Sequence, residues 1–385
     1  MDFRLTDDQD RLREAARVFA AAEMPAIARD LEDNDEPLGR EHVKRYAGMG
    51  FLGINVAEDL GGLGLGNIEA LLVLEEFAKV SPAVAFPIFE SSVGPVRAVE
   101  HFAEGDLARR IVPRVCAGDM IVAVAMSEPD AGSALTDLKT RAELKGGAIT
   151  LNGQKRWCSG GGHADGYVVY ARMSDDPGAR GIGAVFVEKD RDGLSFGAPE
   201  RLMGFRGIPS ADIFFDDVRV PAENLIGGEE GRGLQQILAG LELGRINVAA
   251  RGVGLARVCL DESLAYAQNR KTFGKPICEH QAIQIKLADM ATRVEAARLL
   301  TEQAARAYDT GERCDLEAGM AKLFATEAAL ENSLEAMRIH GAYGYSKEFN
   351  IERYYRDAPL LAIGEGTNEL QRIIIARQLV ERNPV

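Results

Sequence analysis

The segment Ile363-Gly364-Glu365-Gly366-Thr367-Asn368-Glu369 places one carboxylate between two glycines. It follows the apolar run 359–363 and precedes a helical pattern over 369–380. Glycine neighbours remove side-chain bulk around Glu365 and let the backbone approach a ligand closely. A carboxylate on such a loop, at the edge of an apolar segment, is suited to act as a general base. An acid just before a helix also favours the positive end of that helix, so the segment alone supports both interpretations equally.

The residues around this segment, 231 to 385, have the pattern of a helical bundle. Long helical patterns extend over roughly 232–269, 281–310, 315–338 and 368–381. Gly311 and Gly341 are suited to terminate two of these helices. Four helices of this length predict a C-terminal four-helix bundle.

Periodicity changes in the residues before the bundle. Between 121 and 230, short strand-like runs follow one another without intervening helices, and Lys145-Gly146-Gly147 is typical of a hairpin turn. This spacing predicts a middle domain built as a small β-barrel or sandwich. Residues 1–120 are helical in pattern and begin with a capping box of Thr6 and Gln9. The predicted fold is therefore α+β, with domains at 1–120, 121–230 and 231–385.

Composition excludes several classes of protein. The 385 residues carry a net charge of −14, which argues against a nucleic-acid surface. The five cysteines form no Cys-x-x-Cys pair, so we expect a reducing, cytoplasmic compartment and no metal site. The acidic start is unlike a signal peptide, and no uncharged apolar stretch is long enough to span a bilayer. The glycine-rich stretch 61–66 lacks the third glycine of a dinucleotide fingerprint, so we interpret it as a flexible connection.

Two loops of the predicted β domain could hold a ligand. The stretch Met126 to Ser133 leaves a strand with two hydroxyls, a proline and a glycine, which suits a polar ring edge or a phosphate but is also an ordinary Pro-Asp turn. Trp157, the only tryptophan, is followed by Ser159, so an aromatic face and a donor could flank a flat ligand. A single tryptophan is more often a core residue.

Two basic stretches belong to the C-terminal block. Arg270 to Pro276 ends a long helix, where positive charge complements the helix dipole or could hold a pyrophosphate. Arg245 follows Leu243-Gly244 inside the helical pattern among apolar neighbours. Arginines are uncommon in such surroundings without a partner or a ligand.

These stretches together resemble the FAD-dependent acyl-CoA dehydrogenase family over essentially the whole chain. The resemblance is carried by the order and spacing of five stretches, which are Met126 to Ser133, Trp157-Cys158-Ser159, Arg270 to Pro276, His340 to Tyr345 and Ile363 to Asn368. It implies an N-terminal α domain, a middle β domain and a C-terminal four-helix bundle, usually in a homotetramer built from dimers. It also implies that FAD lies between the middle and C-terminal domains and reaches across a subunit interface.

The resemblance implies roles for particular residues. Ser127 would bond the flavin pyrimidine edge, Trp157 would pack on the flavin ring, and Ser159 would bond near its reactive nitrogen. Arg270 and Phe273 would hold the adenine side of the neighbouring subunit's FAD. Positions of cofactor contact are Met126, Ser127, Gly132, Ser133, Trp157, Ser159, Arg270, Phe273, Gln281, Arg338, His340, Gly341, Thr367 and Glu369, and positions of substrate contact are Ser133, Arg245, Gly364 and Gly366.

The family chemistry fits these residues. A base must remove the proton alpha to a thioester, and Glu365 is suited to this if apolar surroundings raise its pKa. By the resemblance, the enolate oxygen takes hydrogen bonds from the Glu365 N–H and from a ribityl hydroxyl, while hydride leaves the beta carbon for FAD. Electrons then pass to an electron-transferring flavoprotein. Some relatives place the base just before the arginine in the first bundle helix, and here that position is Gly244.

The chain departs from the family pattern at several positions. Gly364 replaces a frequent tyrosine, which predicts a wider site for a branched, cyclic or bulky acyl group unless a neighbouring side chain fills the gap. Ala134 replaces an acid, Arg338 a glutamine and Ala342 a glycine. Relatives that accept dicarboxylic acyl groups have an arginine near Glu90, and its absence here disfavours such a substrate.

Other functions compete with an acyl-CoA dehydrogenase. A flavin oxidase or a desulfinase would share the fold and act on an acyl-CoA thioester, and a non-catalytic subunit could hold FAD. A di-iron bundle would need Glu-x-x-His motifs. None of the five histidines has a glutamate three residues before it, which excludes that class.

Overall fold

The computed structural model describes residues 4–227, 233–311 and 313–384. The N-terminal part is helical, as the sequence predicts, and begins at the expected capping box. Gln9 N donates to Thr6 Oγ1 at 3.2 Å, and Thr6 N donates to Gln9 Oε1 at 3.0 Å. Phe19, Tyr46, Phe51 and Phe77 pack their rings together between these helices. The helices are α1 (Asp7–Asn34), α2 (Arg40–Gly48), α3 (Asn67–Ala78), α4 (Phe86–Ile88), α5 (Pro95–Phe102) and α6 (Leu107–Cys116), with a π-helical turn at Phe89–Val93.

The middle of the chain forms a β-rich unit, which confirms the predicted change of periodicity. Its strands join in the order β6-β7-β3-β2-β4-β5-β8, and β1 pairs in parallel with β4. The predicted hairpin at 145–147 connects two antiparallel strands. The strands are β1 (Val122–Ala125), β2 (Arg141–Lys145), β3 (Ala148–Ser159), β4 (Gly166–Arg172), β5 (Ile182–Glu188), β6 (Leu194–Phe196), β7 (Ser210–Pro221) and β8 (Leu225–Ile226).

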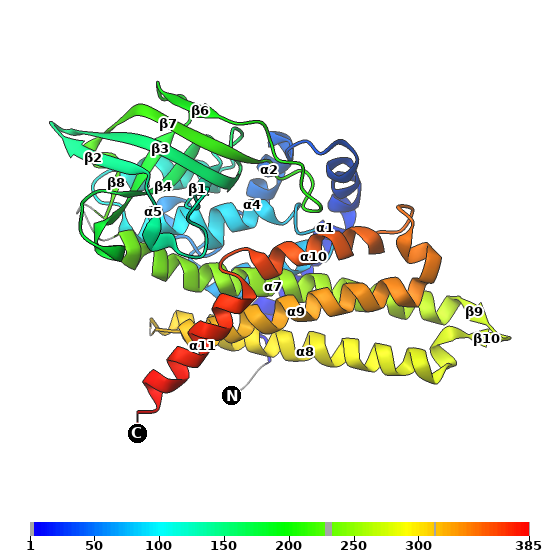
Figure 1. Cartoon of the computed structure of the whole chain (residues 1–385). Helices are drawn as coiled ribbons and strands as arrows, with labels where there is room; N and C mark the ends of the chain where they lie inside the picture. The colour runs from blue at the N-terminus through cyan, green and yellow to red at the C-terminus, as the bar shows by residue number, and fades with distance from the viewer. Residues whose placement is uncertain (1–3, 228–232, 312, 385) are drawn as a thin grey trace.

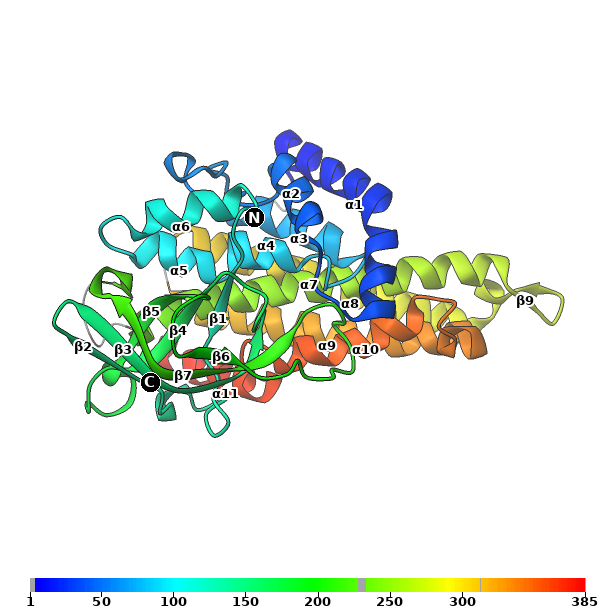
Figure 2. The same cartoon turned by 90° about the horizontal axis from the view of Figure 1, so that it is seen from above.

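The C-terminal part is a bundle in which α7, α8 and α9 lie side by side (Figure 1). Figure 2 shows the N-terminal helices along one side of α7 and the sheet along the other. The hairpin of β9 and β10 lies at the far end of the bundle from the sheet in both views. The elements are α7 (Gly233–Asn269), β9 (Lys271–Thr272), β10 (Lys275–Pro276), α8 (Gln281–Asp309), α9 (Asp315–His340), α10 (Ile351–Ile363) and α11 (Asn368–Arg382).

Two features differ from the sequence analysis. The apolar run 359–363 is the end of α10, a helix that the sequence analysis did not identify because Pro359 interrupts its pattern. The glycine-rich stretch 61–66 is not simply a flexible connection. Its backbone is hydrogen-bonded to the preceding segment, for example from Gly64 N to Val56 O at 2.8 Å. A Cβ atom at Gly62 would lie 2.1 Å from the same carbonyl oxygen, so the close approach requires glycine.

All five cysteines are free thiols, as expected from their scattered spacing. Within the described residues, no helix is long and apolar enough to cross a bilayer.

Candidate active site

Glu365 lies in a short connection between α10 and α11 whose backbone is unusual. Its φ is +54°, a left-handed conformation that is uncommon for a residue with a side chain, and Gly366 follows with φ +83°. Thr367 then caps α11 by accepting a hydrogen bond from Leu370 N at 3.3 Å. A strained backbone of this kind persists only where its surroundings hold it in place. Glu365 is therefore presented by a fixed turn between two helices.

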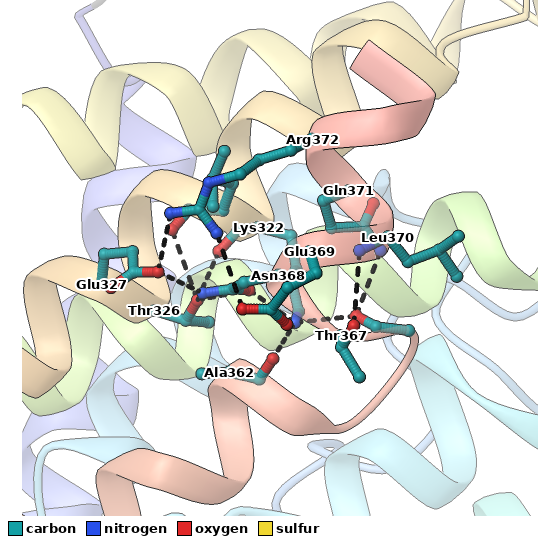
Figure 3. A network of polar contacts seen from close by, with 12 residues as sticks. Lys322, Thr326, Glu327, Ala362, Thr367, Asn368, Glu369, Leu370, Gln371 and Arg372 are labelled. Carbon is teal, nitrogen blue, oxygen red and sulfur yellow. Dashed lines mark hydrogen bonds and ion pairs between the residues drawn. The ribbon is translucent and has the colours of Figure 1, made fainter. Parts of the chain in front are cut away.

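Lys322 of α9 fixes this turn by hydrogen bonds. Its Nζ donates to the carbonyl oxygens of Ala362 and Gly366, both at 2.9 Å, and to Asn368 Oδ1 at 2.8 Å (Figure 3). The lysine is fully buried, so these three acceptors replace its water. One ammonium group thereby joins the end of α10, the loop and the start of α11.

A second set of side chains secures the start of α11. Asn368 Nδ2 donates to Thr326 Oγ1 and to Glu327 Oε1, both at 3.0 Å. Gln371 Nε2 donates to Gly366 O at 3.1 Å. The Asn368 bonds tie the start of α11 to α9, and the Gln371 bond ties α11 to the loop, so the bundle sets the position of the carboxylate.

Gly244 of α7 faces the Glu365 carboxylate. A Cβ atom at Gly244 would lie 2.8 Å from Glu365 Oε2, closer than two such atoms normally approach. The carboxylate of Glu365 therefore lies where a side chain at residue 244 would begin. Any side chain at residue 244 would displace this carboxylate.

The environment of Glu365 suits a group that accepts a proton. Burial raises its pKa above the ordinary value, while the charges of Arg251, Arg245 and Lys322 act in the opposite direction. A carboxylate with a raised pKa is a stronger base, and a positioned base within reach of a C–H proton is the requirement for general-base catalysis. Burial raises the pKa of Tyr170, and the charge of Glu365 acts in the same direction, so strand β4 of the sheet passes near this carboxylate.

Arg245 is buried, as its apolar neighbours predicted, and it has a protein partner. Its Nη1 donates to Asp315 Oδ1 at 2.9 Å, and Asp315 also accepts from Arg313 Nε at 2.6 Å. The Nε of Arg245 is buried and has no hydrogen-bond partner among the described residues. Arg245 therefore retains a donor after its ion pair is formed.

Gly364 leaves space beside Glu365. A Cβ atom there would meet only Leu360 O, at 3.3 Å. Apart from its two chain neighbours, no described side chain comes within 4 Å of that position, so the immediate surroundings of the missing Cβ are open. Gly364 and Gly366 flank the carboxylate without enclosing it.

The Met126 to Ser133 stretch follows β1 and is tied to β3. Lys155 is fully buried and donates to Met126 O at 3.0 Å and to Glu128 Oε1 at 2.8 Å. Arg156 N donates to Ser127 O at 2.8 Å. The stretch contains the predicted turn, closed between Glu128 and Ala131, and Ser127 is partly buried while Gly132 and Ser133 are exposed. The Ser127 and Trp157 regions are thereby brought together.

Trp157 is not a core residue, which settles the alternative that the sequence left open. The pairing of β3 with β7 shifts register between Lys155 and Cys158, and Trp157 has φ +60° within that bulge. The bulge turns the indole outward, so that 53% of the residue is exposed. The Arg156 guanidinium lies 4.5 Å from the indole centroid. Ser159, two residues further, is partly buried at the end of the strand.

The remaining predicted residues gather at the opposite end of the bundle. Arg270 follows α7, and its guanidinium lies 5.9 Å from the Tyr343 ring. Phe273 is 96% exposed at the tip of the β9–β10 hairpin, and Gln281 is exposed at the start of α8. Figure 1 shows this end well separated from the α10–α11 connection. A single chain therefore does not bring Arg270 and Phe273 to Glu365.

The end of α9 belongs to the same distal group. His340 is buried, stacks on Tyr266 with centroids 4.2 Å apart, and its Nδ1 is bonded to Ala336 O at 2.8 Å. Burial lowers the pKa of His340. Gly341 has φ +62° and open space where a Cβ would be. Arg338 is exposed and bonds Glu335. Glu369 does not belong to the distal group, since it is exposed at the start of α11, close to Glu365.

Sequence reasoning did not identify Lys322 or Arg251, the two other cations that act on Glu365. Each lies in a helix among small apolar residues, as in Val248-Ala249-Ala250-Arg251 and Ala321-Lys322-Leu323. A single charge on the apolar face of a helix is the signal that could have found them. It was overlooked because a charged residue in a helix is usually solvated.

Comparisons with known proteins cover all three parts of the chain. The family descriptions "Acyl-CoA dehydrogenase, N-terminal domain", "middle domain" and "C-terminal domain" match residues 6–119, 123–218 and 231–380. The chain is 39% identical to an acyl-CoA dehydrogenase of Bacillus subtilis over 98% of this chain and 99% of that protein.

Solved structures agree with this assignment. Butyryl-CoA dehydrogenase from Megasphaera elsdenii superposes with a TM-score of 0.95 at 32% identity, covering 99% of this chain and 100% of that one. A chain from a structure described as the electron transferring flavoprotein of Acidaminococcus fermentans has a TM-score of 0.96 at 34% identity, with 99% and 100% coverage.

Proposed function

Because the chain belongs to the acyl-CoA dehydrogenase family, we propose that it is an FAD-dependent acyl-CoA dehydrogenase in which Glu365 removes the alpha proton of the thioester. The members of this family are oxidoreductases that act on CH–CH groups. The single observation that carries the proposal is the placement of Glu365, which is partly buried, fixed by Lys322 and seated against Gly244.

The chain's own residues account for the proton transfer. Burial raises the pKa of Glu365, so the protonated product of the step is stabilised. Among the described residues, no acceptor takes the Glu365 N–H, so this donor is available to the thioester oxygen as enolate character develops. The fixed turn holds the base and this donor in one geometry, which lowers the entropic cost of the reaction.

The residues of the β unit fit a flavin. Ser127 and Ser159 provide hydroxyls, and Trp157 provides a flat, half-exposed ring turned out of the sheet by a bulge. These groups match the edge and the face of a planar heteroaromatic ligand. When bound, FAD supplies the acceptor for the hydride that leaves the beta carbon.

We propose that the distal group serves the FAD of a neighbouring copy. Arg270 and Phe273 project from the far end of the bundle, where they cannot contact a ligand held at Trp157 of the same chain. A homotetramer built from dimers would pair such an end with a second active site. An electron-transferring flavoprotein is the proposed electron acceptor.

The open space at Gly364 supports a substrate that is branched, cyclic or otherwise bulky near its alpha or beta carbon. Gly364→Tyr should narrow this space. Its activity on a branched or cyclic thioester should fall by about 10- to 200-fold relative to a straight-chain one, the range that one or two groups in a pocket produce. Wild-type activity confined to short straight chains would contradict this part of the proposal.

The test of the reaction is anaerobic bleaching of the flavin by a panel of acyl-CoA thioesters, with Glu365→Gln beside the wild type. One thioester class should bleach the wild-type flavin, and the variant should not respond. Normal bleaching in the variant would overturn the role of Glu365. Oxygen consumption in the absence of another acceptor would indicate an oxidase, and release of sulfite would indicate a desulfinase.

A further inference from the structure

Arg251 of α7 is a buried cation that forms no ion pair with any described carboxylate, although the charge of Glu365 acts on it. The residue is 5% exposed, and burial lowers its pKa to about 10. No hydrogen bond or ion pair joins its guanidinium to any described residue, and its Nε is buried and unsatisfied. One face of the group rests 5.3 Å from the Phe89 ring. The guanidinium thus offers unused N–H donors in a largely buried site.

Each of the other described buried lysines and arginines has at least one hydrogen-bonded oxygen, although the Nε atoms of Arg97, Arg245 and Arg353 are unsatisfied. Lys155 bonds Glu128, Arg245 bonds Asp315, and Lys322 bonds three oxygens. Arg97 and Arg353 donate to the carbonyl oxygens of Asn55 and Val80, respectively. A buried charge without a partner costs more free energy than a protein retains without a reason. Arg251 is the exception among the described buried lysines and arginines.

The guanidinium lies beside the proposed reaction site. Arg251 follows Gly244 by seven residues, so both lie on the same face of α7, about 10 Å apart along its axis. Gly244 touches Glu365, and Arg251 is the foremost of the charges that lower the pKa of Glu365. Side chains on a helix lean toward its N-terminus, which brings the Arg251 head back toward Glu365.

A second unsatisfied group shares this face. Asn247 lies three residues after Gly244 and four before Arg251, so it neighbours both on the helix. It is fully buried, and neither of its amide atoms has a hydrogen-bond partner among the described residues. Two adjacent side chains with unused donors indicate a ligand group rather than a packing defect.

Glu90 does not take the place of this ligand. It follows Phe89 and is buried, but the charges that act on its pKa are those of Arg40 and Asp165, not of Arg251. Burial raises the pKa of Glu90 to about 8, so the group is largely neutral at pH 7. A position for Glu90 Oε1 near Gly160 agrees with this, since a Cβ there would lie 3.7 Å away.

We propose that Arg251, assisted by Asn247, binds a carboxylate carried by the acyl group, so that the substrate is the CoA thioester of a dicarboxylic acid. This inference rests on the proposed function, because it places the second carboxylate in the same acyl site as the reacting carbons. A guanidinium forms two parallel bonds to a carboxylate, and the amide of Asn247 adds a donor. This proposal replaces the expectation, drawn from the absence of an arginine near Glu90 in the sequence, that such a substrate is disfavoured. Arg251 supplies the cation from α7 instead, against the ring of Phe89, the residue before Glu90.

The experiment compares each dicarboxylic mono-CoA thioester with its own terminal methyl ester. Succinyl-, glutaryl- and adipyl-CoA and their esters differ within each pair only by the charge that Arg251 would recognise. Binding is measured by calorimetry on the FAD-loaded Glu365→Gln protein, which removes turnover. We expect one acid to bind at least about 100-fold more tightly than its ester, the effect of a buried charge-assisted contact.

Variants of Arg251 in the Glu365→Gln protein test whether Arg251 causes the preference for the acid over the ester. In Arg251→Met the acid-to-ester ratio should fall to about one or below, because the carboxylate would be buried without a partner. In Arg251→Lys an intermediate ratio of about 10 is expected, since the charge remains and the fork is lost. Circular dichroism and FAD content are checked first, and the acid–ester comparison on Arg251-containing protein stands even if Arg251→Met does not fold.

The outcomes distinguish failure of the carboxylate site at Arg251 from failure of the proposed dehydrogenase activity. Equal affinity for acid and ester in the Arg251-containing protein overturns the inference. An equal loss of affinity for acid and ester in Arg251→Met also overturns it and would indicate that Arg251 acts on the pKa of Glu365 instead. Failure of every thioester, including straight-chain monocarboxylic ones, to bleach wild-type flavin would instead overturn the proposed function.

Discussion

The two ends of the bundle differ in how completely one chain builds them. At the α10–α11 connection, Glu365 is fixed by hydrogen bonds from Lys322 and Gln371 and is surrounded by buried cations. At the β9–β10 hairpin, Phe273 is 96% exposed and no described side chain covers it. At the first end, contacts within one chain hold the connection that carries Glu365, whereas the second end exposes the ring of Phe273 to solvent.

This difference indicates a division of labour. Chemistry requires a base held within a narrow geometry, which only a packed interior supplies. An exposed aromatic tip on a rigid helical end is suited to enter another molecule's site, where its apolar surface is removed from water. Variants at the two ends should therefore affect different properties, namely the rate of reaction at one and the retention of FAD and assembly at the other.

The largest effect is expected for Glu365→Gln. The amide keeps the shape of the side chain but cannot accept the alpha proton, so flavin reduction should slow by about 10³-fold or more. Stopped-flow reduction under anaerobic conditions measures this rate. The matched control is Glu143→Gln, the same substitution at an exposed position of β2, which should leave the rate unchanged.

Lys322→Met should come next, because it releases the turn that carries the base. Three buried oxygens lose their donor, which costs about 1–3 kcal/mol for each that remains unsatisfied. We expect a lower thermal unfolding midpoint and reduction slowed by about 100-fold. A variant with normal stability and a normal rate would show that the turn holds itself without the lysine.

The pH dependence of flavin reduction should follow the titration of Glu365 and should not depend on the residues of the β9–β10 hairpin. Only the carboxylate form accepts a proton, and burial raises the pKa of Glu365, so the reduction rate should fall about tenfold per pH unit below that pKa and level off above it. Loss of the Lys322 charge removes an influence that lowers this pKa, so the midpoint should move to higher pH in Lys322→Met. A pH–rate profile of both proteins measures the shift, and an unchanged midpoint would argue against this coupling.

Phe273→Ala should have the smallest effect and a different signature. Loss of one aromatic contact is worth about 0.5–1.5 kcal/mol, which predicts FAD affinity weakened by about 2- to 12-fold. The absorbance ratio of flavin to protein and sedimentation velocity report cofactor content and assembly. The reduction rate of the FAD-loaded fraction and its pH midpoint should stay the same; a change in either would break the proposed separation of the two ends.

Several features were predictable because they depend on local pattern. The capping box at Thr6, the hairpin at 145–147 and the ends of the long helices follow from residues that are close in sequence. The helix α10 was not predicted, because Pro359 and the short apolar run hid its periodicity. The domain boundaries at 120 and 230 and the roles of the site residues stay predictions.

The environment of Glu365 could not be predicted in the same way. Gly244, Arg251, Lys322 and Glu365 come from three separate segments, and only packing shows that they meet. Trp157 is similar, since a register shift between β3 and β7, not its composition, turns it outward. Such contacts depend on the register of elements far apart in the chain.

The sequence by itself determined the block structure, the family resemblance and the carboxylate between two glycines, because periodicity and motif spacing are local properties. The tertiary structure decided what surrounds that carboxylate: a lysine that fixes its turn, a glycine that makes room for it and an arginine that no described residue bonds. The reason is physical. Burial, charge balance and unsatisfied hydrogen bonds are properties of residues in contact, and they arise only when the helices pack.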